Sequence, residues 1–199
     1  QASALGIVAL GQALVILAGG IDLSVGSVLT LINIVAASLM AGRNEATLPV
    51  ALLCLAIGAG IGLVNGLGVT KLRIPPFVMT LCTMSAIQGI YLVYSGGSPR
   101  GNAPGALRRI STGYAFDIFP YQALIWIALT LLINLLLKRS TFGRAVYSVG
   151  SNARAARLSG ISVTGTRITT YILSGIMASV AGLLLTGYIG TGSFTLGAD

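Results

Sequence analysis

The chain has no histidine and few acidic or cysteine residues: of its 199 residues, four are Asp or Glu and two are Cys. Without histidine, the commonest general base and the Ser/His and Cys/His dyads of hydrolases are missing. Cys54 and Cys82 lie inside apolar runs without CxxC spacing, so the sequence supports neither a metal site nor a disulfide framework. Together with the lack of GxSxG and HExxH sequences, these absences argue against an enzyme.

Charge is scarce throughout the chain. Charged residues make up 8% of it, against about 25% in ordinary soluble domains. Hydrophobic residues make up 55%, and the mean hydropathy is +0.92. The composition therefore indicates an integral membrane protein. The net charge of +8 does not indicate nucleic-acid binding, because the Lys and Arg residues lie in the gaps between apolar runs, as basic cytoplasmic loops do.

Six apolar runs approach the roughly 20 residues that a helix needs to cross the hydrocarbon, two of them marginally. They are residues 2–18, 25–41, 48–70, 77–94, 119–137 and 168–190. All six are expected to be helices, because an open sheet in lipid would leave backbone groups without partners. The predicted fold class is all-α: a polytopic membrane protein with about six transmembrane helices in a single domain, residues 1–199. Since the chain starts inside an apolar run without Met or signal peptide, we expect a fragment of a longer protein.

The basic residues predict which ends of the helices face the cytoplasm. Residues 138–167 carry six basic residues and no acid, which is typical of a cytoplasmic loop. Alternation of the helices then places Lys71 and Arg73 on the cytoplasmic side as well. Four arginines fall outside: Arg43, Arg100, Arg108 and Arg109. The small residues Gly58, Gly62 and Gly66, and likewise Ser174, Ala178 and Gly182, predict close helix packing.

The segment GGIDLS, residues 19–24, separates the first two apolar runs. Alternation requires the chain to reverse there, so we predict a very tight turn or a helix break at membrane depth. Asp22 has no basic neighbour in sequence, so no local salt bridge holds it. Two interpretations stay open and are compatible. Asp22 or Ser24 caps the following helix, or the carboxylate also belongs to a gate or substrate path.

The basic loop contains the signals of a short helix. Ser151 or Asn152 is a suitable N-cap, ARAARLS supplies helix formers, and Gly160 supplies a C-terminal stop. We therefore expect a short cytoplasmic helix at residues 153–159. It serves either as a handle for a soluble partner or as part of a loop that only sets topology.

Three stretches in this order resemble a known family: GGIDLSVGS (19–27), NGLGVTKLRIPPFVMTL (65–81) and FGRAVYSVGSNARAARLSGI (142–161). Together they resemble the permease subunit of bacterial ABC importers of the ribose, galactose, xylose and arabinose type. The resemblance implies an inner-membrane subunit that pairs with a second permease copy and receives a monosaccharide from a periplasmic sugar-binding protein. It also implies an ATP-binding subunit at the cytoplasmic face. This chain has no GxxxxGK[ST] phosphate loop, so we expect it to bind no cofactor and its partner to use the ATP.

The resemblance also assigns candidate residues. The coupling helix that docks on the ATP-binding subunit would comprise Asn152, Arg154, Ala155, Ala156, Arg157, Leu158 and Gly160. A neutral sugar must bind weakly enough to leave, so the path should be lined by polar groups without strong charge. The candidates are Gly20, Asp22, Ser24, Asn33, Asn65, Thr80, Gln88 and Asn134. The loop 95–118 is a candidate contact for the binding protein. The sequence departs from the family at Cys82 and Gln88, where relatives often have glycine and arginine.

Two other transport classes compete with this interpretation. A branched-chain amino-acid ABC permease would differ only in substrate. An ion-coupled secondary transporter usually needs several ionisable groups within the membrane, and Asp22 is nearly alone there.

Overall fold

The computed structural model describes residues 2–98, 100–115 and 118–194. Helices form at all six predicted positions: α1 (Ala2–Leu17), α2 (Val25–Met40), α3 (Thr47–Thr70), α4 (Pro76–Ser95), α6 (Tyr121–Arg139) and α9 (Val163–Ile189). The connections contain η1 (Asn44–Ala46), α5 (Gly105–Thr112), α7 (Thr141–Ser151), α8 (Ala153–Leu158) and a two-stranded antiparallel hairpin of β1 (Tyr114–Ala115) and β2 (Phe119–Pro120). The prediction of an all-α polytopic fold is confirmed, with the small hairpin as an addition.

Among the described residues, four helices are long and apolar enough to cross a membrane: α3 together with η1, α4, α6 and α9. Helix α2 has 16 residues and so rises about 24 Å, less than the roughly 30 Å hydrocarbon core. The described part of α1 also has 16 residues. The six predicted runs are thus all helical, and α2 is shorter than a full span.

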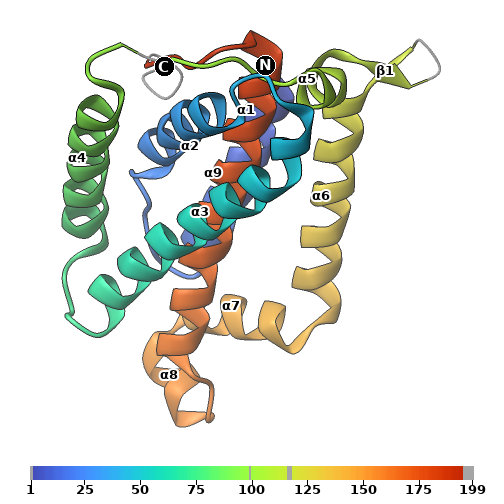
Figure 1. Cartoon of the computed structure of the whole chain (residues 1–199). Helices are drawn as coiled ribbons and strands as arrows, with labels where there is room; N and C mark the ends of the chain where they lie inside the picture. Colours follow the sequence, from blue (N-terminus) through green and yellow to red (C-terminus); the bar gives the residue numbers. More distant parts are fainter. Residues whose placement is uncertain (1, 99, 116–117, 195–199) are drawn as a thin grey trace.

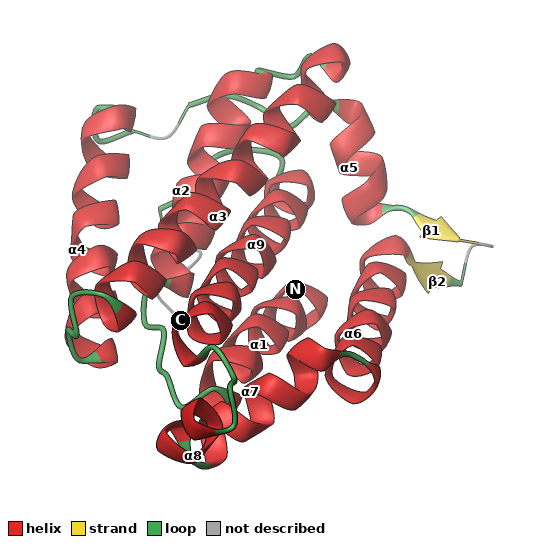
Figure 2. Ribbon diagram, turned by 90° about the horizontal axis from the view of Figure 1, so that it is seen from below, coloured by secondary structure: helices red, strands yellow, loops and turns green. Residues whose placement is uncertain are grey.

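Helix α9 is the centre of the bundle. Figures 1 and 2 show it crossing the molecule among α1, α2 and α3, with α4 and α6 on opposite flanks. Small residues allow this packing: a Cβ added at Gly62 would clash with the Tyr171 carbonyl, and one at Gly182 would lie 2.8 Å from the Leu29 carbonyl. The predicted role of the small residues in helix packing is therefore confirmed.

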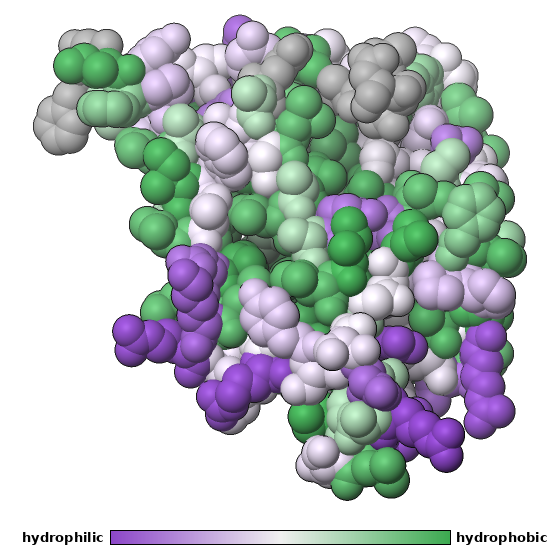
Figure 3. Space-filling view, turned by 180° about the vertical axis from the view of Figure 1, so that it is seen from behind, coloured by the Kyte–Doolittle hydropathy of each residue, from purple (hydrophilic) through white to green (hydrophobic). Residues whose placement is uncertain are grey.

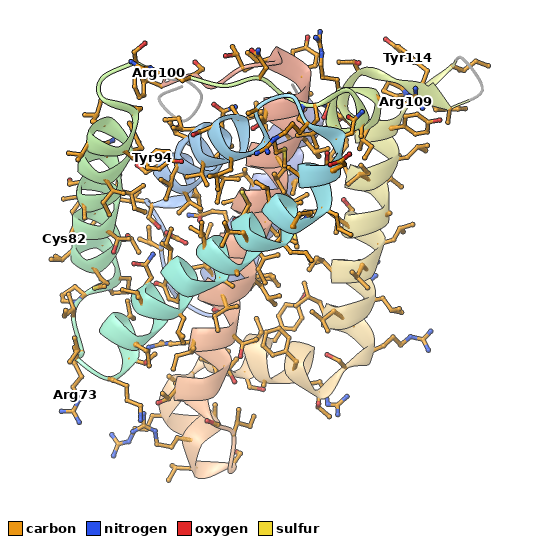
Figure 4. The ribbon with its side chains drawn as sticks, in the orientation of Figure 1. Arg73, Cys82, Tyr94, Arg100, Arg109 and Tyr114 are labelled. Atoms are coloured by element: carbon orange, nitrogen blue, oxygen red, sulfur yellow. The ribbon has the colours of Figure 1, made fainter. Side chains whose placement is uncertain are left out.

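The connections gather at two opposite ends of the bundle. Helix α5 and the hairpin lie at one end, and α7 and α8 lie at the other (Figure 1). The basic residues divide in the same way, because Arg100 and Arg109 lie at the α5 end and Arg73 at the α8 end (Figure 4). This grouping agrees with the two sides expected from the sequence.

The surface has the pattern of a protein that faces lipid. Figure 3 shows hydrophobic residues over the middle of the molecule and a group of strongly hydrophilic residues toward its lower end. The outer helices expose large apolar side chains, among them Leu131 and Leu135 on α6 and Ile90 and Val93 on α4. Such a surface is stable in a bilayer rather than in water.

Three features differ from the sequence-based expectation. Helix α7 was expected as loop, but Ser140 caps it by accepting a hydrogen bond from the Gly143 N–H, and Val146 and Val149 are buried on one face. Helix α5 also lies inside a predicted loop. Helix α9 begins at Val163 rather than at 168, because the Ser162 hydroxyl accepts from the Gly165 N–H and extends the helix beyond its apolar part.

Candidate functional site

The break between α1 and α2 packs against α9, with Asp22 and Ser24 buried on its inner side and Ile21 exposed on its outer side. The chain turns at Gly19, whose φ of +75° favours glycine. At Gly20 a Cβ would lie 2.8 Å from the Tyr171 hydroxyl. Ser174 of α9 also contacts the break, eleven residues after the start of α9, which is about 16 Å along that helix. The tight break predicted within residues 19–24 is therefore confirmed, and it lies well inside the span of α9.

Asp22 is buried in this break, with 3% of its surface exposed. Its Oδ1 accepts hydrogen bonds from the Ser24 backbone N–H at 3.0 Å and from the Ser24 hydroxyl at 2.6 Å. Its Oδ2 accepts one from the Ser174 hydroxyl at 3.0 Å. Three hydrogen bonds rather than a local salt bridge hold the carboxylate, as expected from the sequence.

The capping interpretation is right only in part. Asp22 binds a backbone N–H where α2 starts, but its second oxygen is held by α9. Ser24 occupies the N-cap position, yet its side chain makes no capping hydrogen bond. Its hydroxyl donates to Asp22 and accepts from the Asn65 amide instead. The prediction that Ser24 caps α2 through its side chain is therefore wrong.

A chain of buried hydrogen bonds continues from the break into α3 and α4. The Asn65 amide, which is fully buried, donates to the Ser24 hydroxyl at 2.9 Å. The Thr83 hydroxyl donates to the Asn65 carbonyl oxygen at 2.6 Å. We call Asp22, Ser24, Asn65, Thr83 and Ser174 the polar chain. Linked hydrogen bonds of this kind polarise and strengthen one another in a low-dielectric interior.

Helix α9 holds the break at three successive points. The Arg167 Nε donates to the Ala18 carbonyl at 3.3 Å, and the Tyr171 hydroxyl donates to the Ile21 carbonyl at 3.1 Å. Ser174 binds Asp22. The spacing of these three residues places them on one face of α9. The break and α9 are therefore joined along two turns of helix.

The other candidate path residues lie apart from the polar chain. Asn33 of α2 is buried against a later part of α9. Its amide donates to the Thr186 hydroxyl at 2.9 Å, and its carbonyl oxygen accepts from the Ser193 N–H at 2.7 Å. Thr80 donates to the Pro76 carbonyl within its own helix. Gln88 is half-buried on α4, and Asn134 is exposed on α6.

The sequence-based candidates omitted Thr83, Ser174 and Tyr171. Ser174 had a signal, since it belongs to a small-residue stripe, but that stripe indicated packing alone. Nothing in the sequence marks Thr83 or Tyr171, because their partners come from other helices.

Helix α8 forms as predicted from its capping residues. The Asn152 side-chain oxygen accepts from the N–H groups of Arg154 and Ala155, both at 3.0 Å. At the other end Gly160 has a φ of +80°, its N–H bonds the Arg157 carbonyl, and the Ile161 N–H bonds the Ala156 carbonyl. This is a Schellman motif, the standard use of glycine after a helix.

The two faces of α8 differ. Ala156 is 4% exposed and packs with Val149 of α7 and Val163 of α9, whereas Leu158 is 84% exposed. The side chains of Arg154 and Arg157 are also exposed. Because α8 extends beyond the rest of the bundle (Figure 1), this outer face is open to a soluble partner.

In the part of the chain that the structure describes, no three His, Cys, Asp or Glu side chains group closely enough to hold a metal ion. Both cysteines are free, Cys54 buried and Cys82 exposed.

The apolar helices, the break and the projecting helix define a multi-pass helical membrane protein. The family described as "Branched-chain amino acid transport system / permease component" matches residues 1–199, and the chain belongs to this family. It is therefore a protein of the permease class, located in the bacterial inner membrane.

Among its relatives are ribose import permease proteins RbsC. The chain is 35% identical over 200 residues to that of Bacillus subtilis (strain 168), covering 96% of this chain and 60% of the relative. It is 38% identical over 197 residues to that of Escherichia coli (strain K12), covering 92% and 58%. The autoinducer 2 import system permease protein LsrC of Yersinia enterocolitica is 37% identical over 185 residues, with 92% and 51% covered. The chain thus spans 60% or less of the length of these relatives, and no solved structure matches it. The resemblance to ribose-type permeases is confirmed.

Proposed function

We propose that the chain is part of the membrane-spanning permease subunit of an ATP-driven, binding-protein-dependent importer, and that it helps to carry a monosaccharide across the inner membrane. The names of the relatives, ribose and autoinducer 2 import permeases, support a sugar or sugar-like substrate. The observation that carries the proposal is the projecting helix α8, which is capped at both ends and leads directly into α9.

The partners follow from this proposal. An ATP-binding subunit docks on α8 at the cytoplasmic face through the exposed residues Asn152, Arg154, Ala155, Arg157, Leu158 and Gly160. Ala156 was predicted to join them, but it is buried against Val149 and Val163 and so holds α8 on the bundle instead. A periplasmic sugar-binding protein delivers the substrate at the opposite end, where residues 95–118 are the candidate contact. A second permease copy completes the pathway. The chain itself hydrolyses nothing and binds no cofactor, because the partner subunit uses the ATP.

Movement at α8 reaches the break through α9 in this mechanism. Ala156 packs against Val163 at the start of α9, so a displaced α8 carries that end of α9 with it. Two turns further on, α9 holds the break through Tyr171 and Ser174. Closure of the ATP-binding subunits therefore tilts α9 and the break together, which alternately opens and closes the path.

The gate is proposed at the polar chain. Gly20, Asp22, Ser24 and Asn65 lie together where the break meets α3 and α9. Exchange of these hydrogen bonds for bonds to sugar hydroxyls would let the path open without leaving buried polar groups unpaired. Asn33, Thr80 and Gln88 stay candidates for other levels of the path.

Both alternatives are less well supported. A branched-chain amino-acid substrate agrees with the description of the family, but the relatives quoted above are named for ribose and autoinducer 2. An ion-coupled transporter would need a carboxylate free to bind the ion, whereas three hydrogen bonds occupy both oxygens of Asp22.

The test is substrate-stimulated ATPase activity of the complete protein in proteoliposomes with its ATP-binding subunit and binding protein. We expect ribose or another monosaccharide, presented with the binding protein, to stimulate hydrolysis, and leucine to have no effect. Uptake driven by a proton gradient in the absence of the ATP-binding subunit would contradict the proposal.

A further inference from the structure

A basic cleft of about 700 Å³ lies at the α8 end of the bundle. Three separate elements contribute an arginine to it: Arg73 from the α3–α4 connection, Arg157 from α8 and Arg167 from α9. Figure 4 shows Arg73 at the lower end of that connection, on the same end of the bundle as α8. Residues far apart in sequence therefore bring three positive charges around one cavity.

No acidic side chain balances these charges among the described residues that line the cleft. The two acids that the structure describes lie elsewhere. Asp22 is bound by Ser24 and Ser174 in the break, and Glu45 belongs to η1 at the opposite end. Like charges around a cavity repel one another, so an anion within it would stabilise the arrangement.

One of the arginines is held in place by a side-chain hydrogen bond. Arg167 donates from Nε to the Ala18 carbonyl, which uses one of the five N–H donors of its guanidinium and leaves the others for a ligand. Arg73 has a φ of +58°, a left-handed conformation that residues with a Cβ seldom adopt. Strained backbone of this kind is concentrated at binding and active sites.

The rest of the lining combines apolar residues, among them Val69, Pro76 and Val163, with the hydroxyl-bearing residues Thr70, Ser162 and Thr164. The cleft thus joins hydroxyl and guanidinium groups to partly apolar walls at the end of the membrane helices, the level at which phospholipid headgroups lie. Basic pockets between helices on the cytoplasmic side are suited to anionic headgroups, and the guanidinium fork matches phosphate oxygens in pairs.

We propose that this cleft is a binding site for a phosphate-bearing anion, supplied by the headgroup of an anionic phospholipid or by free phosphate. The proposal goes beyond the transport function and does not depend on it. A lipid held there would contact α8, α9 and the α3–α4 connection at once, and would favour the arrangement in which the three arginines converge.

The experiment is thermal unfolding of the complete protein in neutral detergent, titrated with short-chain phosphatidylglycerol, phosphatidylcholine or inorganic phosphate at matched concentrations. We expect phosphatidylglycerol to raise the melting temperature saturably and phosphatidylcholine to have little effect. If inorganic phosphate raises the melting temperature as much as phosphatidylglycerol does, the ligand is the free anion. If inorganic phosphate has a smaller effect, the ligand is the lipid. Both results support the site, provided that the arginine variants respond as described next.

The variant Arg73→Gln/Arg157→Gln removes two exposed arginines of the cleft and leaves the Arg167 contact with Ala18 intact. We expect about fivefold weaker binding for each arginine removed, and so about 25-fold for the pair. The matched control is Arg144→Gln/Arg154→Gln, which makes the same charge change at the same end but outside the cleft; it should bind as the wild type does. An unchanged response of the cleft variant would overturn the proposal. So would an equal response to both lipids.

Discussion

Asp22 is the residue on which the break depends. An acidic side chain at the centre of a membrane helix costs about 2.5 to 3.5 kcal/mol on insertion scales, and burial leaves only 3% of this one exposed. The two Ser24 donors and the Ser174 hydroxyl offset that cost by bonding both carboxylate oxygens. The same bonds tie the break to α9. The contacts that bury Asp22 therefore also supply its hydrogen bonds.

Two substitutions separate the hydrogen bonds of Asp22 from its charge. In Asp22→Asn the amide has the same size, accepts from Ser24 and donates to Ser174, so we expect thermal stability close to wild type. Asp22→Ala leaves buried donors unpaired and should lower the free energy of unfolding by about 1 to 3 kcal/mol. Thermal unfolding of the complete protein in detergent measures both. An Asn variant as unstable as the Ala variant would show that the charge holds the break.

At this scale the sequence identified the carboxylate but not its partners. The glycines around Asp22 and the lack of a nearby base predicted an acid at a turn at membrane depth, without a local salt bridge. Ser174 is 152 residues away from Asp22, and the pair forms only because α9 packs against the break. Such contacts depend on how the helices are arranged in space, which the order of residues in one chain does not state.

The elements divide into those with strong local signals and those without. Helix α8 was predictable because Asn152 and Gly160 each favour one position at a helix end. Helix α7 was missed because its buried face is small, with Gly143, Val146 and Val149, and it lies among charged residues that indicated a loop. Helices α1 and α2 were predictable in position. Helix α1 ends at the break, and the 16 residues of α2 lie between the break and the turn after Met40.

The end of α8 gives a prediction at this scale. Gly160→Val places a β-branched residue at a φ of +80°, which it cannot adopt without strain, so α8 should lose its Schellman end. We expect sugar-stimulated ATPase activity of the assembled transporter to fall severalfold while membrane insertion is unchanged. Gly160→Asn is the control, because asparagine tolerates the left-handed conformation and should retain most of the activity. If the Val variant kept full sugar-stimulated ATPase activity, α8 would only help to set which side of the membrane the helix ends face.

The contact of α3 with α9 gives a second prediction at the scale of the helices. A Cβ at Gly62 would clash with the backbone of Tyr171, whereas a Cβ at Gly60, on the same helix, meets no described atom within 4 Å. Gly62→Ala should therefore force the helices apart and lower the melting temperature. Gly60→Ala should be neutral or stabilising by up to about 1 kcal/mol, since alanine is the better helix former. Equal effects of the two would contradict the packing described here.

In the whole molecule, α9 connects the two functional regions. One end of it packs with α8, and its middle holds the break through Tyr171 and Ser174. The sequence predicted the two ends of the bundle through its basic loops, and the helices through their apolar runs. It did not predict that α9 lies at the centre, because its composition resembles that of α3, which has more exposed surface. Helix α9 is buried because other helices pack around it, not because of its own composition.

The most direct test of the account is a pair of distance measurements by spin labels on the complete protein, with Cys54 and Cys82 replaced by serine. One pair joins Leu158→Cys on α8 to Ile21→Cys in the break, and the other joins Leu158→Cys to Val93→Cys on α4; all three sites are exposed. The assembled transporter is measured without nucleotide and with bound ATP. If α8, α9 and the break move as one unit, the 158–21 distance stays constant while the 158–93 distance changes. A 158–21 distance that changes as much as the 158–93 distance would contradict the account.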